Sequence, residues 1–248
     1  MKVKMATDWS YNIAFFIFLI GIPIYISFVL WALMDSPQVS YCLADAFCTV
    51  QNQCSIITIP FAAFLVVHSI KYDFFPSVIL HMKNVRNLWI RLCKKIIKNA
   101  FIISFYLLIC TTLIGIQFGR FNNNWIEENS AASNLLHTQV PHNGNVWEIL
   151  FVFTIMTFLT IVFFGMLIAL LWWIFGTPLI GYVIIILLIK LELGMQPAAI
   201  HLFFLKVNMN PYVIYWLGVS YYNLVVYPLI LIIGLFLMGL FIRKKDFL

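Results

Sequence analysis

The stretch ILFVFTIMTFLTIVFFGMLIALLWWIFGTPLIGYVIIILLI, residues 149–189, decides the fold. It contains no charged residue, and as one straight helix it would extend about 61 Å at 1.5 Å per residue. The hydrocarbon core of a bilayer is about 30 Å thick, so the stretch is expected to cross it and turn back. Gly176, Thr177 and Pro178 supply the turn, because proline lacks a backbone donor and clashes with the preceding helical turn. A strongly kinked pair of helices is the alternative.

The chain as a whole has the composition of a membrane protein. Of its 248 residues, 63% are hydrophobic and only 10% are charged, whereas soluble globular domains are about 25% charged. A water-soluble globule is therefore excluded, and no nucleic-acid partner is expected. Apolar runs near the length of a bilayer crossing predict a single all-α membrane domain over residues 1–248. The six predicted spans are about 12–34, 54–71, 99–118, 148–175, 177–193 and 220–242.

The positive charges predict the orientation of these spans. Six spans place both termini on one side, and cytoplasmic loops collect Lys and Arg near span ends. With the termini in the cytoplasm, every Lys and Arg except Arg120, Lys190 and Lys206 lies on the inner side. The long polar connections at 35–53 and 119–147 are then external. The first apolar run is too long for a cleaved signal peptide and is expected to stay in the bilayer.

The densest group of positive charges lies in HMKNVRNLWIRLCKKIIKNAF, residues 81–101. At about 100° per residue, this segment predicts an amphipathic helix. One side carries Lys83, Arg91, Lys94, Lys95 and Lys98; the other carries Val85, Leu88, Trp89, Leu92 and Ile96; Arg86 lies between the two. Such a helix is expected on the inner membrane surface, with its cations toward anionic headgroups or a docked partner. An ordinary anchor that only fixes orientation is the alternative.

The basic segment KNVRNLWIRLCKKIIKN, the six spans around it and a broken segment before the last span resemble the permease subunit of a compact type-two ABC exporter. The resemblance covers nearly the whole chain, and within that superfamily it points to Gram-positive systems for peptide or bacteriocin export and lantibiotic immunity. It implies a cytoplasmic amphipathic coupling helix that docks on the ATPase subunit. Carried onto this sequence, coupling to the ATPase would fall to Phe75, Lys83, Arg86, Trp89, Arg91, Lys94 and Lys95.

The same resemblance implies a function and a set of partners. The chain would be the multi-pass permease of a bacterial plasma membrane, exporting an amphipathic peptide or a similar hydrophobic cargo. It would pair with a second permease chain, identical or related, and with cytoplasmic ATP-binding cassette subunits. No Gly-x-x-x-x-Gly-Lys-Ser/Thr motif occurs, so ATP and Mg are expected on that partner and no enzymatic activity is expected here. A stand-alone membrane immunity or sensor protein is the alternative.

The segment before the last span is expected to lie on the outer face. Gly194 and Pro197 precede AAIHLFFLKVNMNP, residues 198–211, and exposed polar backbone is tolerated at membrane depth only where protein or water covers it. In type-two exporters such a segment closes the outer end of the pathway. The gate candidates are Lys190, Glu192, His201 and Lys206. Lys190 and Glu192 also stand near a span end, where snorkelling to the interface is the alternative.

Other chemistry-bearing patterns are few. No His-Glu-x-x-His motif and no catalytic or metal-ligating group is found; His137 and His142 are interpreted as surface histidines of a loop. An external loop permits disulfides, and Cys42, Cys48 and Cys54 leave their pairing open. Gly115 and Gly119 form a Gly-x-x-x-Gly pair that would let two helices approach closely.

Overall fold

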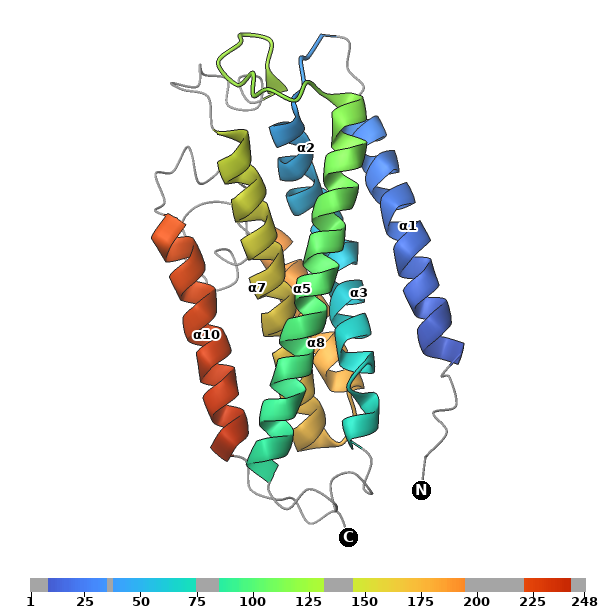
Figure 1. The fold of residues 1–248 in the computed structure, drawn as a ribbon, viewed down its shortest axis with the longest axis vertical. Coiled ribbons are helices and arrows are strands. Elements are labelled where there is room, and N and C mark those ends of the chain that lie inside the picture. The colour runs from blue at the N-terminus through green and yellow to red at the C-terminus, as the bar shows by residue number, and fades with distance from the viewer. Residues whose placement is uncertain (1–8, 35–37, 75–84, 132–144, 195–220, 242–248) are drawn as a thin grey trace.

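The structure is a computed structural model that describes residues 9–34, 38–74, 85–131, 145–194 and 221–241. Over these residues it is all-helical, as predicted. The helices are α1 (Trp9–Met34), α2 (Leu43–Thr49), the π-helix η1 (Val50–Cys54), α3 (Ser55–His68), the 3₁₀-helix η2 (Lys71–Phe74), α5 (Val85–Phe118), α7 (Val146–Phe175), α8 (Leu179–Gly194) and α10 (Tyr221–Phe241). They form one elongated bundle in which successive long elements alternate in direction (Figure 1).

Three described helical stretches are long and apolar enough to cross a membrane: Ile13–Met34, Arg86–Phe118 and Val146–Phe175. Three shorter apolar stretches accompany them: Ile57–His68, Leu179–Leu188 and Val225–Phe241. Each of the six overlaps one of the apolar runs that the sequence predicted as spans; Arg86–Phe118 begins well before the predicted 99–118, and Val146–Phe175 begins two residues before the predicted 148–175. The chain thus has the helical content and apolarity of a membrane-associated protein.

The centre of the bundle is α7, a helix of 30 residues. It contacts α5, α10, α3, α8 and α2. Its sequence is apolar on all sides, and a helix of that kind is expected to be surrounded by other helices. By contrast, α1 buries one stripe of Phe18, Ile22, Ile26, Leu30 and Met34, spaced four residues apart, and exposes most of its other large apolar side chains. The exposed faces are the natural contact surface for lipid or for another chain.

The turn expected at residues 176–178 is present. Helix α7 ends at Phe175, and Gly176 follows with φ of 76° in the left-handed region. Glycine adopts this conformation without steric cost, and its N–H donates a hydrogen bond to the Trp172 carbonyl at 2.8 Å. Helix α8 begins at Leu179 and returns alongside α7 (Figure 1). The kinked-pair alternative is therefore wrong.

The second helical run differs from the prediction. The span was expected at 54–71, but α2, η1 and α3 follow one another without a gap from Leu43 to His68, so the run begins eleven positions earlier. Much of the predicted external connection 35–53 is therefore helical and buried. The reason lies in Asp45, whose carboxylate accepts from the backbone N–H of Cys42 at 2.8 Å and starts the helix.

Residues 119–131, part of the other predicted external connection, lie on the start of this run. The Arg120 N–H donates to the Tyr41 carbonyl at 3.0 Å, and the Leu43 N–H donates to the Arg120 carbonyl at 2.8 Å. Trp125, which is fully buried, donates from Nε1 to Asp45 Oδ1 at 2.8 Å. The two connections that the sequence treated separately are thus one packed cap over this end of the bundle.

Gly115 and Gly119 permit this packing, as the Gly-x-x-x-Gly pattern predicted. A Cβ on Gly115 would lie 2.9 Å from the Cβ of Ala46, and one on Gly119 would lie 2.8 Å from the backbone carbon of Cys42. Both distances are shorter than real carbon–carbon contacts. The close approach of α5 to α2 therefore requires glycine at both positions.

No disulfide joins the cysteines, all of which lie in the described residues. All five, including Cys42, Cys48 and Cys54, are buried thiols. Cys42 is the N-cap of the short helix α2 and Cys48 lies in its last turn, six positions further on, which points their side chains in different directions around the helix axis. Burial, together with the nearby Asp45 carboxylate, raises the pKa of the Cys42 thiol to about 12. The disulfide permitted by an external location is thus absent from this part of the chain.

The Gly115→Ala substitution should destabilise the protein. The added methyl overlaps Ala46, and such overpacking costs about 1–3 kcal/mol, more than the roughly 1 kcal/mol that alanine gains in a helix. Gly234→Ala is the matched control, because this helical glycine has open space around it. Thermal unfolding in a mild detergent should give a lower Tm for Gly115→Ala and an equal or higher Tm for Gly234→Ala. Equal stability of the two variants would contradict the close helix contact.

Cys42 should resist alkylation in the folded protein. With its pKa raised to about 12, the thiol stays almost entirely protonated between pH 7 and 9, so its labelling by iodoacetamide should stay very low throughout that range. In denaturant the thiolate forms near its ordinary pKa, and labelling should rise with pH. Mass spectrometry of digested protein measures the labelling. A mass two units lower for a Cys42–Cys48 peptide pair without reductant would reveal a disulfide and contradict the structure.

Candidate functional site at the basic end of α5

The predicted amphipathic helix is not a separate element. Helix α5 runs without interruption from Val85 to Phe118, 34 residues, so the basic segment and the third span are one rod about 51 Å long. The helix that contains the predicted third span therefore begins fourteen positions before residue 99. The local reason is the absence of glycine and proline between Val85 and Gly115, which leaves nothing to break the helix where its charges end.

The apolar face of this segment is covered by protein. Leu88, Leu92 and Ile96 are fully buried and Trp89 is 2% exposed, so the periodicity was predicted correctly but its placement in the acyl boundary was wrong. Trp89 donates from Nε1 to the Phe236 carbonyl of α10 at 2.9 Å. Its ring fits there because residue 239 is glycine, where a Cβ would overlap the indole. Trp89 therefore ties α5 to α10 and lies away from the surface.

The polar side is organised by one carboxylate, that of Asp73 in η2. Its side chain is 5% exposed, and two cations from successive turns of α5 reach it: Arg91 Nη2 lies 3.3 Å from Oδ1, and Lys95 Nζ contacts Oδ2. Charge-assisted bonds of this kind are stronger than neutral ones, and a buried carboxylate requires them. We call Asp73, Arg91 and Lys95 the Asp73 clamp.

Next to the clamp, η2 is also fixed to α7. Phe74 stacks on Trp172 with ring centroids 4.2 Å apart and an interplanar angle of 7°, and meets Trp173 edge-on at 5.8 Å. One turn further along α5, Asn99 donates to Ser69 Oγ at 2.6 Å. The last described residues before position 75 are therefore held on both α5 and α7.

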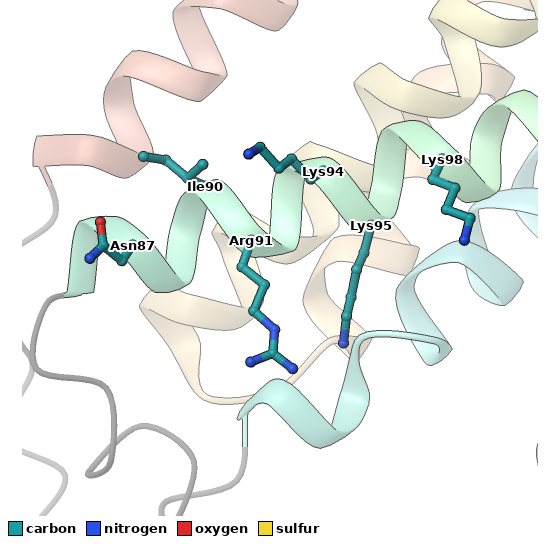
Figure 2. A pocket seen from close by; sticks show the side chains of 6 residues that line it. All are labelled: Asn87, Ile90, Arg91, Lys94, Lys95 and Lys98. Carbon is teal, nitrogen blue, oxygen red and sulfur yellow. The ribbon is translucent and has the colours of Figure 1, made fainter.

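The remaining cations of the segment point to the surface. Lys94 and Lys98 are exposed, and in the described part of the chain neither has an ion-pair or hydrogen-bond partner. They line a shallow concavity of about 480 Å³ together with Asn87, Ile90, Arg91 and Lys95. Figure 2 shows Arg91 and Lys95 reaching toward η2 while Lys94 extends from the opposite side of α5.

The other predicted site residues are placed as follows. Arg86 is exposed near the start of α5. Phe75, Lys83, His201 and Lys206 lie outside the described residues, as does the predicted broken segment. Lys190 and Glu192 belong to the last turns of α8, whose backbone is described. The structure thus gathers Arg91, Lys94 and Lys95 at one place, whereas the predicted gate group falls largely outside the described residues.

Asp73 was missed by sequence reasoning. It is the only acidic residue between the predicted second and third spans, opposite a cluster of basic residues, and that imbalance was a usable signal. Gln51 and Thr157 were missed too: Thr157 Oγ1 donates to Gln51 Oε1 at 3.3 Å, and both are buried between η1 and α7. Among the described residues, no group of three or more His, Cys, Asp or Glu side chains could hold a metal ion.

Comparisons with protein families, characterised proteins and solved structures find no match to this chain. The functional argument therefore starts from the geometry of the basic end of α5.

A double-mutant cycle should measure the Asp73 clamp. Asp73→Asn and Lys95→Met should each destabilise the protein, and their effects should couple by about 0.5–3 kcal/mol because the two groups contact each other. Lys94→Met is the matched control: it is adjacent in sequence but has no carboxylate partner in the described residues, so its cycle with Asp73→Asn should give no coupling. Chemical or thermal unfolding in detergent gives the free energies. Additive effects of Asp73→Asn and Lys95→Met would contradict the clamp.

Proposed function

We propose that this chain is the six-span permease subunit of an ATP-driven exporter in a bacterial plasma membrane. Its cargo is an amphipathic peptide or a similarly hydrophobic molecule, and ATP is hydrolysed by a separate cytoplasmic subunit. The alternating directions of the six apolar stretches support six crossings with the basic end of α5 inside. The exposed apolar faces of α1, α5 and α10 leave room for lipid and for a second permease chain.

The Asp73 clamp carries this proposal. A partner that pushes on the connection between η2 and α5 can move the spans only if that connection is mechanically tied to them. Asp73 ties it to α5 through Arg91 and Lys95, and Phe74 ties it to α7 through Trp172. A displacement at the cytoplasmic end would thus move α5, the longest helix, and α7, the central helix, together. Packed helices move together in this way in shear and rigid-body transitions.

The lever differs from the one expected from the sequence. In place of a short helix lying on the membrane, the force-bearing element is α5 itself, a 34-residue rod whose first turns extend beyond a 30 Å hydrocarbon core. Trp89 adds a third attachment, to α10. The connection at 75–84, with Phe75 and Lys83, and the exposed Arg86 would face the ATPase.

Co-purification from the native host tests the partner. The tagged chain, extracted in a mild detergent, should bring down an ATP-binding cassette subunit in stoichiometric amount, and after reconstitution it should stimulate ATP hydrolysis by that subunit. Asp73→Asn should keep the subunit bound while reducing the stimulation by at least ten-fold, since binding and transmission use different residues. Glu127→Gln, an exposed carboxylate at the other end of the bundle, is the matched control and should behave as wild type.

Two outcomes would overturn the proposal. One is recovery of the chain without any ATPase under conditions that preserve other membrane complexes, which is what a stand-alone immunity or sensor protein would give. The other is full stimulation by Asp73→Asn, because the clamp would then play no part in transmission.

A further inference from the structure

One continuous stripe of α5 changes from cationic to apolar within a single turn. At 100° per residue, Lys94, Lys98, Phe101, Phe105 and Ile109 fall within about 80° of one another around the helix axis. All five are exposed: Phe101 is 61% exposed, Phe105 52% and Ile109 43%. The stripe extends about 22 Å along the helix, which is close to the thickness of one leaflet with its headgroups.

The cationic part of this stripe contains two lysines whose charge no described carboxylate neutralises. Arg91 and Lys95 share the Asp73 carboxylate, whereas Lys94 and Lys98 have no partner among the described residues. Asn87, one helical repeat before Lys94 on the same side, adds an exposed amide at the far end of the concavity (Figure 2). A single anionic group seated between Lys94 and Lys98, which are one helical turn apart, would receive two ammonium groups.

The apolar part of the stripe is formed by rings lying along the helix. Phe101 and Phe105 are stacked at 6.5 Å with an interplanar angle of 10°, and Phe158 of α7 meets Phe101 edge-on at 6.3 Å. These flat, exposed rings offer an extended hydrophobic surface that begins 4–5 Å along the axis from Lys98. A ligand that fits the whole stripe needs an anionic head and a long apolar tail.

We infer that this stripe binds an anionic phospholipid, with its phosphate at Lys94 and Lys98 and an acyl chain along Phe101, Phe105 and Ile109. Basic residues at the inner membrane surface attract anionic lipid, and the spacing from cations to rings matches that from headgroup to acyl chain. The positive charges of α5 thus have two separate tasks, since Arg91 and Lys95 serve the Asp73 clamp. The inference requires α5 to stand in a bilayer but not an ATPase partner, so either proposal can fail without the other.

Lipid titration in detergent tests the site. The purified protein in a neutral detergent is titrated with phosphatidylglycerol or with phosphatidylcholine, and retained lipid is counted by native mass spectrometry. Wild type should retain phosphatidylglycerol preferentially, and Lys94→Gln with Lys98→Gln should weaken that binding about thirty-fold, roughly five-fold for each lysine. Arg120→Gln removes an exposed positive charge at the other end of the bundle and should change binding less than two-fold. Both lysines are exposed, and an unchanged Tm verifies that the variant is folded.

Three results would overturn the inference. The first is equal retention of the two lipids by wild type, and the second is wild-type binding by the Lys94→Gln, Lys98→Gln variant. If that variant also loses a cytoplasmic subunit in the pull-down, the surface is a protein-docking face. The third is displacement of phosphatidylglycerol by inorganic phosphate at equal concentration, because a site that includes the aromatic rings holds the lipid far more tightly than phosphate alone.

Discussion

The buried carboxylate of Asp73 constrains the rest of the bundle. A charged group removed from water must be paired, so wherever η2 lies, Arg91 and Lys95 must lie within reach. This fixes the axial position and rotation of the first turns of α5. Because α5 is unbroken, the same setting determines its far end, where Gly115 and Gly119 meet α2 and the backbone of Cys42. The ion pair at one end of α5 and the two glycine contacts about 36 Å along the helix therefore both depend on one position and rotation of α5.

Glycine residues determine how closely the helices approach one another, whereas the Asp73 carboxylate determines the axial position and rotation of α5. Within a membrane, helices gain little from burying apolar surface against each other, so association depends on close van der Waals fit. Gly165 of α7 admits Ile96 of α5, and Gly181 of α8 lies against the backbone of Ile168 in α7. These contacts let α7 occupy the centre of the bundle, with α5, which bears the Asp73 clamp, packed directly on it.

The sequence predicted those parts of the fold whose boundaries are marked by backbone chemistry. Gly176 and Pro178 end one helix and begin the next, and the bounds of α7 and α8 agree with the predicted ranges to within two residues. Charge alone did not predict where a helix begins. Lysine and arginine are compatible with a helix, so α5 continues through the basic segment and begins fourteen positions before residue 99. Asp45 had the opposite effect, since a carboxylate that looks like a loop residue in fact caps a helix. The long-range pairs, such as Trp125 with Asp45, leave no local periodicity and could not be found from one sequence.

The basic end of α5 illustrates the same limit for a functional site. Helical periodicity correctly separated Leu88, Trp89 and Ile96 from the cations, but it does not say whether lipid or protein covers the apolar side. Packing against α10 places that face inside, and on the other side of the helix Arg91 and Lys95 pair with Asp73 while Lys94 and Lys98 are exposed. A count of positive charges treats these four side chains alike. Their burial and partners separate Arg91 and Lys95, which pair with Asp73, from Lys94 and Lys98, which are exposed and have no partner among the described residues.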